Sequence, residues 1–173
     1  NFFVRCLRVR KTLRVQEEDR SIRDANDIIV EGARVKGYTF RRGGDVVRGR
    51  DIPSGFAAVL CGHIHRTQIL TRDLAGRVLR APVLYPGSVE RTSLAERDEP
   101  KGYLTLGIEP DWTSGGRLVD WRFHQLPARP MVSITIETGK VGELPLADSV
   151  RGELATLDPN SVVRIQLQGP GAA

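Results

Sequence analysis

The sequence predicts a mixed fold, α/β to α+β, built mostly from strands with one late helix. A continuous apolar run over residues 56–61 is typical of a strand buried on both faces. Beyond it, apolar stretches of strand length alternate with turn-forming sequences. Near the carboxyl end, Val150, Leu154 and Leu157 recur at helical spacing between two further strand candidates.

The first part of the chain offers less regular patterns. Apolar and basic residues alternate over residues 7–15, which predicts a strand with one basic face, and a polar run follows over residues 16–27. A short apolar segment occupies residues 28–30. Glycines recur throughout residues 31–55, so we expect a loop there with little regular structure.

The second part contains clearer strand signals. Strands are expected over residues 56–61, 64–70, 77–84, 102–108, 116–126, 131–137 and 162–168, and the helix over residues 144–157. Pro127 and Pro130 resist both a helix and a central strand, which places a domain boundary near residue 127. The strand, helix, strand order after this boundary indicates a small α+β unit.

Charge and cysteine content narrow the class of protein. Residues 1–50 hold 13 basic and 7 acidic side chains, so the basic excess of the chain, whose net charge is +5, lies in this first part. Such a basic stretch either contacts the phosphates of a nucleic acid or is simply a solvated face. No stretch approaches the roughly 20 apolar residues of a membrane span. Cys6 and Cys61 are too few for a disulfide framework, and Cys61 is expected to be a buried thiol. We therefore expect a cytoplasmic protein without a membrane partner.

Two of the three histidines lie one residue apart, directly after the predicted buried strand. These residues are His63 and His65, and imidazole nitrogens are common ligands of transition metals. In an extended strand both side chains would point to one face, where they could serve two ions about 4 Å apart. Such a site also needs carboxylates, so the pair by itself leaves open a surface H-x-H pair at a strand edge. Ser88 is interpreted as a turn serine and His124 as structural.

Four stretches around this pair carry a family resemblance. They are residues 30–33 (VEGA), 46–53 (VVRGRDIP), 55–66 (GFAAVLCGHIHR) and 81–93 (APVLYPGSVERTS). Together they resemble the end of a calcineurin-like metallophosphoesterase, in particular the SbcD-type DNA repair exonucleases of bacteria. The resemblance runs from about residue 30 to residue 169.

This resemblance implies a fold, an activity and partners. Residues 1–126 would be the carboxyl-terminal part of a truncated β-sandwich, with residues 1–26 unmatched, and residues 127–173 would begin a partial α+β capping domain that helps hold DNA. The family binds two ions, usually Mn²⁺, and hydrolyses DNA phosphodiesters with metal-activated water. His63 and His65 would be the last two metal ligands. The implied partners are DNA and an SMC-like coiled-coil ATPase of the SbcC type, and a homodimer is a further arrangement.

The sequence also departs from the family. The D-x-H, G-D and G-N-H motifs, which supply most ligands and the histidine that assists the leaving group, do not occur, and Gly44-Asp45 stands in the wrong segment to replace one. Asp27 occupies the place of a family histidine ligand, four residues before Glu31, and is the third candidate metal ligand. No catalytic residue is assigned, and we expect the chain alone to lack activity. Two alternatives stay open: a non-catalytic DNA-binding or assembly fragment, and a phosphoesterase acting on small molecules.

Overall fold

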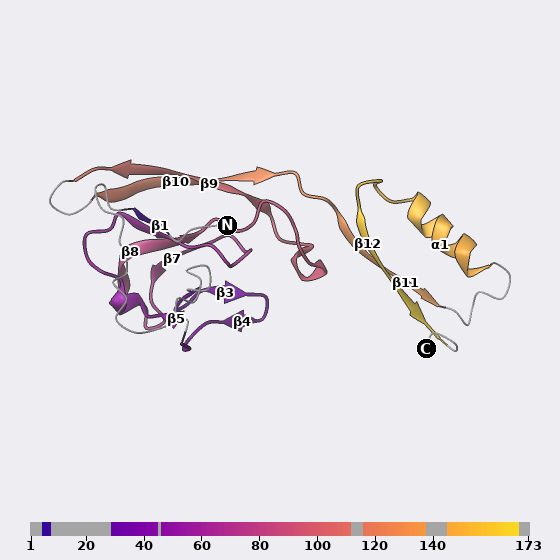
Figure 1. Ribbon diagram of the computed structural model, residues 1–173, viewed down its shortest axis with the longest axis horizontal. Coiled ribbons are helices and arrows are strands. Elements are labelled where there is room, and N and C mark those ends of the chain that lie inside the picture. The colour runs from indigo at the N-terminus through magenta and orange to yellow at the C-terminus, as the bar shows by residue number, and fades with distance from the viewer. Residues whose placement is uncertain (1–4, 8–28, 45, 112–115, 138–144, 170–173) are drawn as a thin grey trace. The chain divides into compact units, whose positions relative to one another are not determined.

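The computed structural model describes residues 29–44, 46–111, 116–137 and 145–169, together with the backbone of residues 5–7 (Figure 1). These residues form mostly β-strands in several small sheets, and the described part contains one α-helix. The chain divides into two compact units, Asn1–Val89 with Pro100–Pro127, and Glu90–Glu99 with Ala128–Ala173. Within the described ranges, no helix has the length and apolar character needed to cross a membrane.

The largest sheet belongs to the first unit. Its strand order is β1 (Arg5–Leu7), β6 (Ala58–Leu60), β8 (Val78–Tyr85) and β7 (Gln68–Arg72). The two central strands, β6 and β8, run parallel and pair through Leu60 and Leu84, whereas both edge strands are antiparallel to their neighbours. Parallel strands end at the same edge of a sheet, so the segments that follow β6 and β8 emerge side by side.

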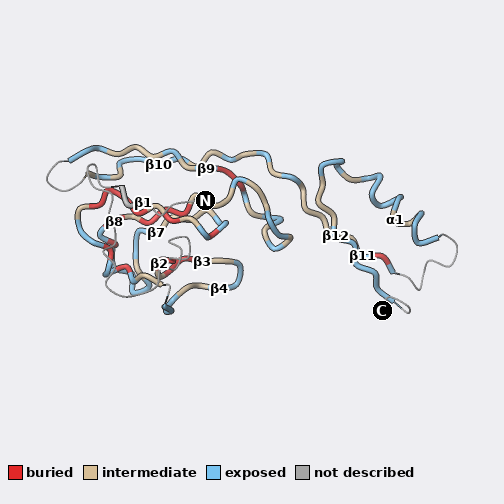
Figure 2. Tube along the Cα trace, in the orientation of Figure 1, coloured by how far each residue is buried: buried red, intermediate tan, exposed pale blue. Residues whose placement is uncertain are grey.

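The buried core surrounds these two central strands, as the red segments in Figure 2 show. Its fully buried members include Ala58, Val83, Leu84 and Tyr85. The prediction that residues 56–61 are buried is confirmed for Phe56 through Val59 and for Cys61, although only Ala58–Leu60 has strand geometry. The apolar run therefore forms the centre of the sheet because it has no polar face to turn toward water.

Residues 29–55 contain only very short elements, as the glycine content predicts. Strand β2 (Ile29–Val30) pairs in parallel with β5 (Val46–Val47), and β3 (Arg34–Val35) forms a hairpin with β4 (Tyr38–Thr39). A 3-10 turn, η2 (Gly49–Asp51), follows. The side-chain amide of Gln68 pairs with the backbone N–H and C=O of Arg34 at 2.7 and 2.8 Å, which ties the hairpin to β7.

A long hairpin completes the first unit. It joins β9 (Lys101–Glu109) to β10 (Arg117–Leu126) in antiparallel register. Both strands were predicted within a residue or so of their observed bounds. A side chain at Gly102 would collide with the carbonyl oxygen of His124, so the close approach of the two strands requires glycine there.

The second unit has the predicted strand, helix, strand order. Strands β11 (Met131–Glu137) and β12 (Val162–Gln168) pair in parallel, and α1 (Leu146–Ala155) lies between them in the sequence. The short turn η3 (Leu94–Glu96) belongs to the same unit. Arg91 joins this segment to the start of the unit by donating to the carbonyl oxygen of Arg129 at 2.8 Å.

Candidate functional site

The H-x-H loop, residues 62–65, leaves the sheet directly after β6. The predicted strand over residues 64–70 is wrong at its start, because β7 begins only at Gln68. The reason is a tight turn centred on His63, where the N–H of Ile64 donates to the carbonyl oxygen of Gly62 at 2.7 Å. His63 has a φ of 65°, a left-handed conformation that costs an ordinary residue about 1–2 kcal/mol and cannot continue a strand.

The two histidines lie on the solvent side of this loop. His63 and His65 are both exposed, whereas Ile64 between them is buried in the core. Ile64 therefore anchors the loop, and the imidazoles reach solvent on either side of it. The backbone differs from the predicted extended strand, because the φ of His63 is positive.

A second turn, residues 86–88, packs against the H-x-H loop. The N–H of Ser88 donates to the carbonyl oxygen of His65 at 3.1 Å, and the Thr67 hydroxyl donates to the carbonyl oxygen of Pro86 at 2.8 Å. Gly87 lies between them with a φ of 81°, and a Cβ there would come within 2.7 Å of Thr67 Oγ1 and 2.9 Å of the His65 carbonyl oxygen. Glycine is therefore required both by the backbone angle and by the contact.

A buried lysine closes this arrangement. Lys101, the first residue of β9, is 1% exposed, and its Nζ donates to the carbonyl oxygen of His65 at 3.2 Å and to Ser88 Oγ at 3.0 Å. Burial of a lysine is tolerated where its donors are bonded. Sequence patterns did not single out Lys101, so this contact was missed. Ser88 occupies a turn, as predicted, and its hydroxyl is an acceptor for the lysine.

The end of β8 also holds the segment that begins with β2. The hydroxyl of Tyr85 accepts a hydrogen bond from the N–H of Val30 at 2.8 Å in the buried core. Burial of the Tyr85 hydroxyl raises its pKa above the usual value, and the neighbouring Cys61 raises it further. Cys61 is a buried thiol, as predicted. Residues 30, 61 and 85, which belong to three of the stretches carrying the resemblance, thus meet at one place.

The structure describes two of the three predicted metal ligands. His63 and His65 supply donors of a kind that fits Mn²⁺ or another transition metal. Asp27 lies outside the described residues, as does Asp45. Within the described ranges, no three His, Cys, Asp or Glu side chains are grouped so as to hold a metal ion. The described residues therefore offer two imidazoles in neighbouring positions without the carboxylates that would complete a site.

The third histidine has a different environment. His124 lies on β10, where its Nε2 is 2.9 Å from Thr105 Oγ1 and its ring stacks on Tyr103 at a centroid distance of 4.8 Å. These contacts join the two strands of the β9–β10 hairpin. His124 is therefore a structural residue, as its place in an alternating strand predicts.

A scan against protein-family models and a search of curated proteins returned no match. The resemblance to metallophosphoesterases therefore rests on the sequence motifs. Three of the stretches that carry the resemblance lie next to one another in the structure. A hydrogen bond links Val30 to Tyr85, which is 55 residues away in the sequence, and another links Ser88 to His65.

Proposed function

We propose that this chain carries the carboxyl-terminal part of a metal-dependent phosphodiesterase that acts on DNA, with His63 and His65 as two of its metal ligands. One observation carries the proposal: an H-x-H loop with two exposed imidazoles follows the buried strand β6 and is held from beneath. The loop is supported by the buried Ile64, by the turn at residues 86–88 and by the buried Lys101. A backbone held by such contacts leaves its ligand side chains less conformational freedom to lose when a metal binds.

In this proposal the β1-β6-β8-β7 sheet is one layer of a truncated sandwich, and β11, α1 and β12 begin the cap. Mn²⁺, when bound, would polarise the phosphodiester and lower the pKa of a bound water. His63 and His65 would bind and orient the ion. The other ligands would come from Asp27 or from a polypeptide segment carrying the D-x-H, G-D and G-N-H motifs that this sequence lacks. An SMC-like coiled-coil ATPase would be the partner, in a cytoplasmic setting.

Calorimetric titration with Mn²⁺ tests the proposed ligands. Because the sequence lacks the motifs that supply most of the family's ligands, the chain should bind one ion weakly, and a His63→Ala, His65→Ala double variant should lose this binding. His124→Ala is the matched control, since it removes the third histidine from a separate hairpin and should leave the titration unchanged. Equal Mn²⁺ binding by the double variant and the unaltered chain would contradict the assignment.

Hydrolysis is tested with a longer polypeptide, in which a segment carrying the three missing motifs precedes residue 28. With Mn²⁺ it should degrade linear DNA, and His63→Ala should abolish the reaction because an ion loses a ligand. The chain alone should be inactive. Hydrolysis of a small phosphodiester such as bis-(p-nitrophenyl) phosphate, with no degradation of DNA, would instead favour the small-molecule phosphoesterase.

A further inference from the structure

Five arginines gather around one pocket of the first unit, and neither His63 nor His65 lines it. The pocket has a volume of about 360 Å³. Its lining residues are Glu31, Arg41, Arg42, Arg48, Arg50 and Arg77. The five arginines come from three places in the sequence: the loop after β4, the segment at the η2 turn and the β7–β8 connection. The fold therefore brings together basic side chains that lie up to 36 residues apart.

The positive charge of this pocket is only partly neutralised. Arg50 lies 3.8 Å from Asp51, and Arg77 lies 2.7 Å from Asp73. The side chains of the other three, Arg41, Arg42 and Arg48, make no ion pair or hydrogen bond with any described residue. Among the described residues, the three unpaired guanidinium groups carry a formal charge of +3 and Glu31 carries −1, which leaves +2 in the pocket. Exposed guanidinium forks of this kind fit phosphate oxygens.

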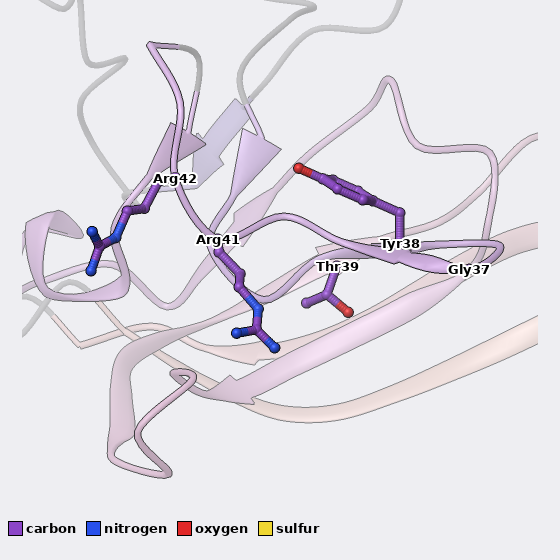
Figure 3. Close-up of a pocket in the computed structure, with 5 residues that line it drawn as sticks. All are labelled: Gly37, Tyr38, Thr39, Arg41 and Arg42. Carbon is purple, nitrogen blue, oxygen red and sulfur yellow. The ribbon is translucent and has the colours of Figure 1, made fainter.

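A second pocket shares two of these arginines and adds an aromatic ring (Figure 3). It has a volume of about 630 Å³ and is lined by Gly37, Tyr38, Thr39, Arg41 and Arg42. Tyr38 is 55% exposed, and its ring meets Phe40 edge to face at a centroid distance of 4.9 Å. Arg41 and Arg42 line both pockets, and in Figure 3 their guanidinium groups project from the chain in different directions.

We propose that the two pockets form one binding site for single-stranded nucleic acid, here called the arginine groove. Arg41, Arg42 and Arg48 contact successive phosphates, and a base stacks on Tyr38. A single strand is favoured over a duplex because only an unpaired base can leave its neighbours and stack on a side chain. An acidic peptide is disfavoured because it would leave the exposed Tyr38 ring without a partner. The site needs no metal, so it goes beyond the proposed phosphodiesterase and stands without it.

Fluorescence anisotropy with a labelled oligothymidylate, in EDTA, tests the groove. Three phosphate contacts on a single strand give a salt slope of about −2, so affinity should fall about 20-fold between about 50 and about 200 mM salt. An Arg41→Gln, Arg48→Gln variant should bind more weakly and show a shallower slope. Arg122→Gln is the matched control, because this exposed arginine on β10 lines neither pocket. An equal loss in the control would show attraction by net charge and overturn the site.

Tyr38→Ala tests the stacking contact. Loss of one stacked base should weaken binding about fivefold or more. Tyr103→Ala, which removes an exposed tyrosine of β9, should not weaken it. Unchanged affinity in Tyr38→Ala, or duplex DNA binding as tightly as the single strand, would refute the single-strand assignment. The His63→Ala, His65→Ala variant should bind the oligonucleotide normally, which separates this site from the metal proposal.

Discussion

The hydrogen bond between the Val30 N–H and the Tyr85 hydroxyl links two parts of the core that are 55 residues apart. Tyr85 is 0% and Val30 2% exposed, so water cannot replace either partner without opening the core. Tyr85→Phe keeps the ring and removes only the hydroxyl, which leaves the Val30 N–H buried without an acceptor. An orphaned buried donor of this kind costs about 1–3 kcal/mol.

Urea unfolding is the first assay for this substitution. The free energy of unfolding should fall by about 1–3 kcal/mol, without the additional loss of about 3–5 kcal/mol that removal of a whole ring brings. Hydrogen exchange supplies a local readout, since the Val30 amide should lose protection in the variant. Tyr103→Phe is the matched control, because Tyr103 is 45% exposed and a surface change of this size stays within about 0.5 kcal/mol.

Two results would refute this reasoning. If Tyr85→Phe unfolds within about 0.5 kcal/mol of the unaltered chain, the bond does not hold the β2 segment to β8. If the Val30 amide keeps its protection, another acceptor replaces the hydroxyl, and the meeting of the motif stretches does not depend on Tyr85.

Two further expectations concern pH and the turn at residues 86–88. Because burial raises the pKa of Tyr85 above the usual value of about 10, its stabilising effect should be complete below that pH and should decline as the pH rises beyond it. Urea unfolding from about pH 9 to about pH 11 measures this decline, which should be smaller in Tyr85→Phe. Gly87→Ala should lower the free energy of unfolding by about 1–3 kcal/mol more than Gly76→Ala, since the clash with Thr67 adds to the cost of the backbone angle. Both glycines have a φ of 81°, and nothing lies within 4 Å of a Cβ at Gly76, so equal losses would show that the turn does not pack closely on the H-x-H loop.

Local sequence patterns predicted several elements well. The strands over residues 131–137 and 162–168 have the predicted bounds, and the apolar run at residues 56–61 is buried around β6. The pattern of apolar and polar residues predicts these strands, because it decides which faces of a strand can be exposed to water. The H-x-H loop failed as a strand because the φ of His63 is positive, and a local pattern of apolar residues does not reveal one backbone angle.

Of the residues at the candidate site, the sequence pointed to the two histidines but not to the residues that support them. His63 and His65 stood out because two histidines of three lie next to one buried run. The buried contacts of Lys101 and the meeting of five arginines were missed, because a lysine or arginine has the same sequence signature whether it is solvated or packed. Burial of a charged side chain depends on which backbone carbonyls and hydroxyls other strands bring to it.

The sequence by itself determined the strands from residue 77 onward, the late helix, the buried run and the pair of histidines, since each of these depends on residues close together along the chain. The tertiary structure alone decided that Lys101 supports His65, that Tyr85 holds Val30, and that arginines from three segments line one pocket. Such contacts join residues tens of positions apart. The parallel pairing of β6 with β8, for example, brings the H-x-H loop and residues 86–88 to the same edge of the sheet, and no local preference of the chain encodes that pairing.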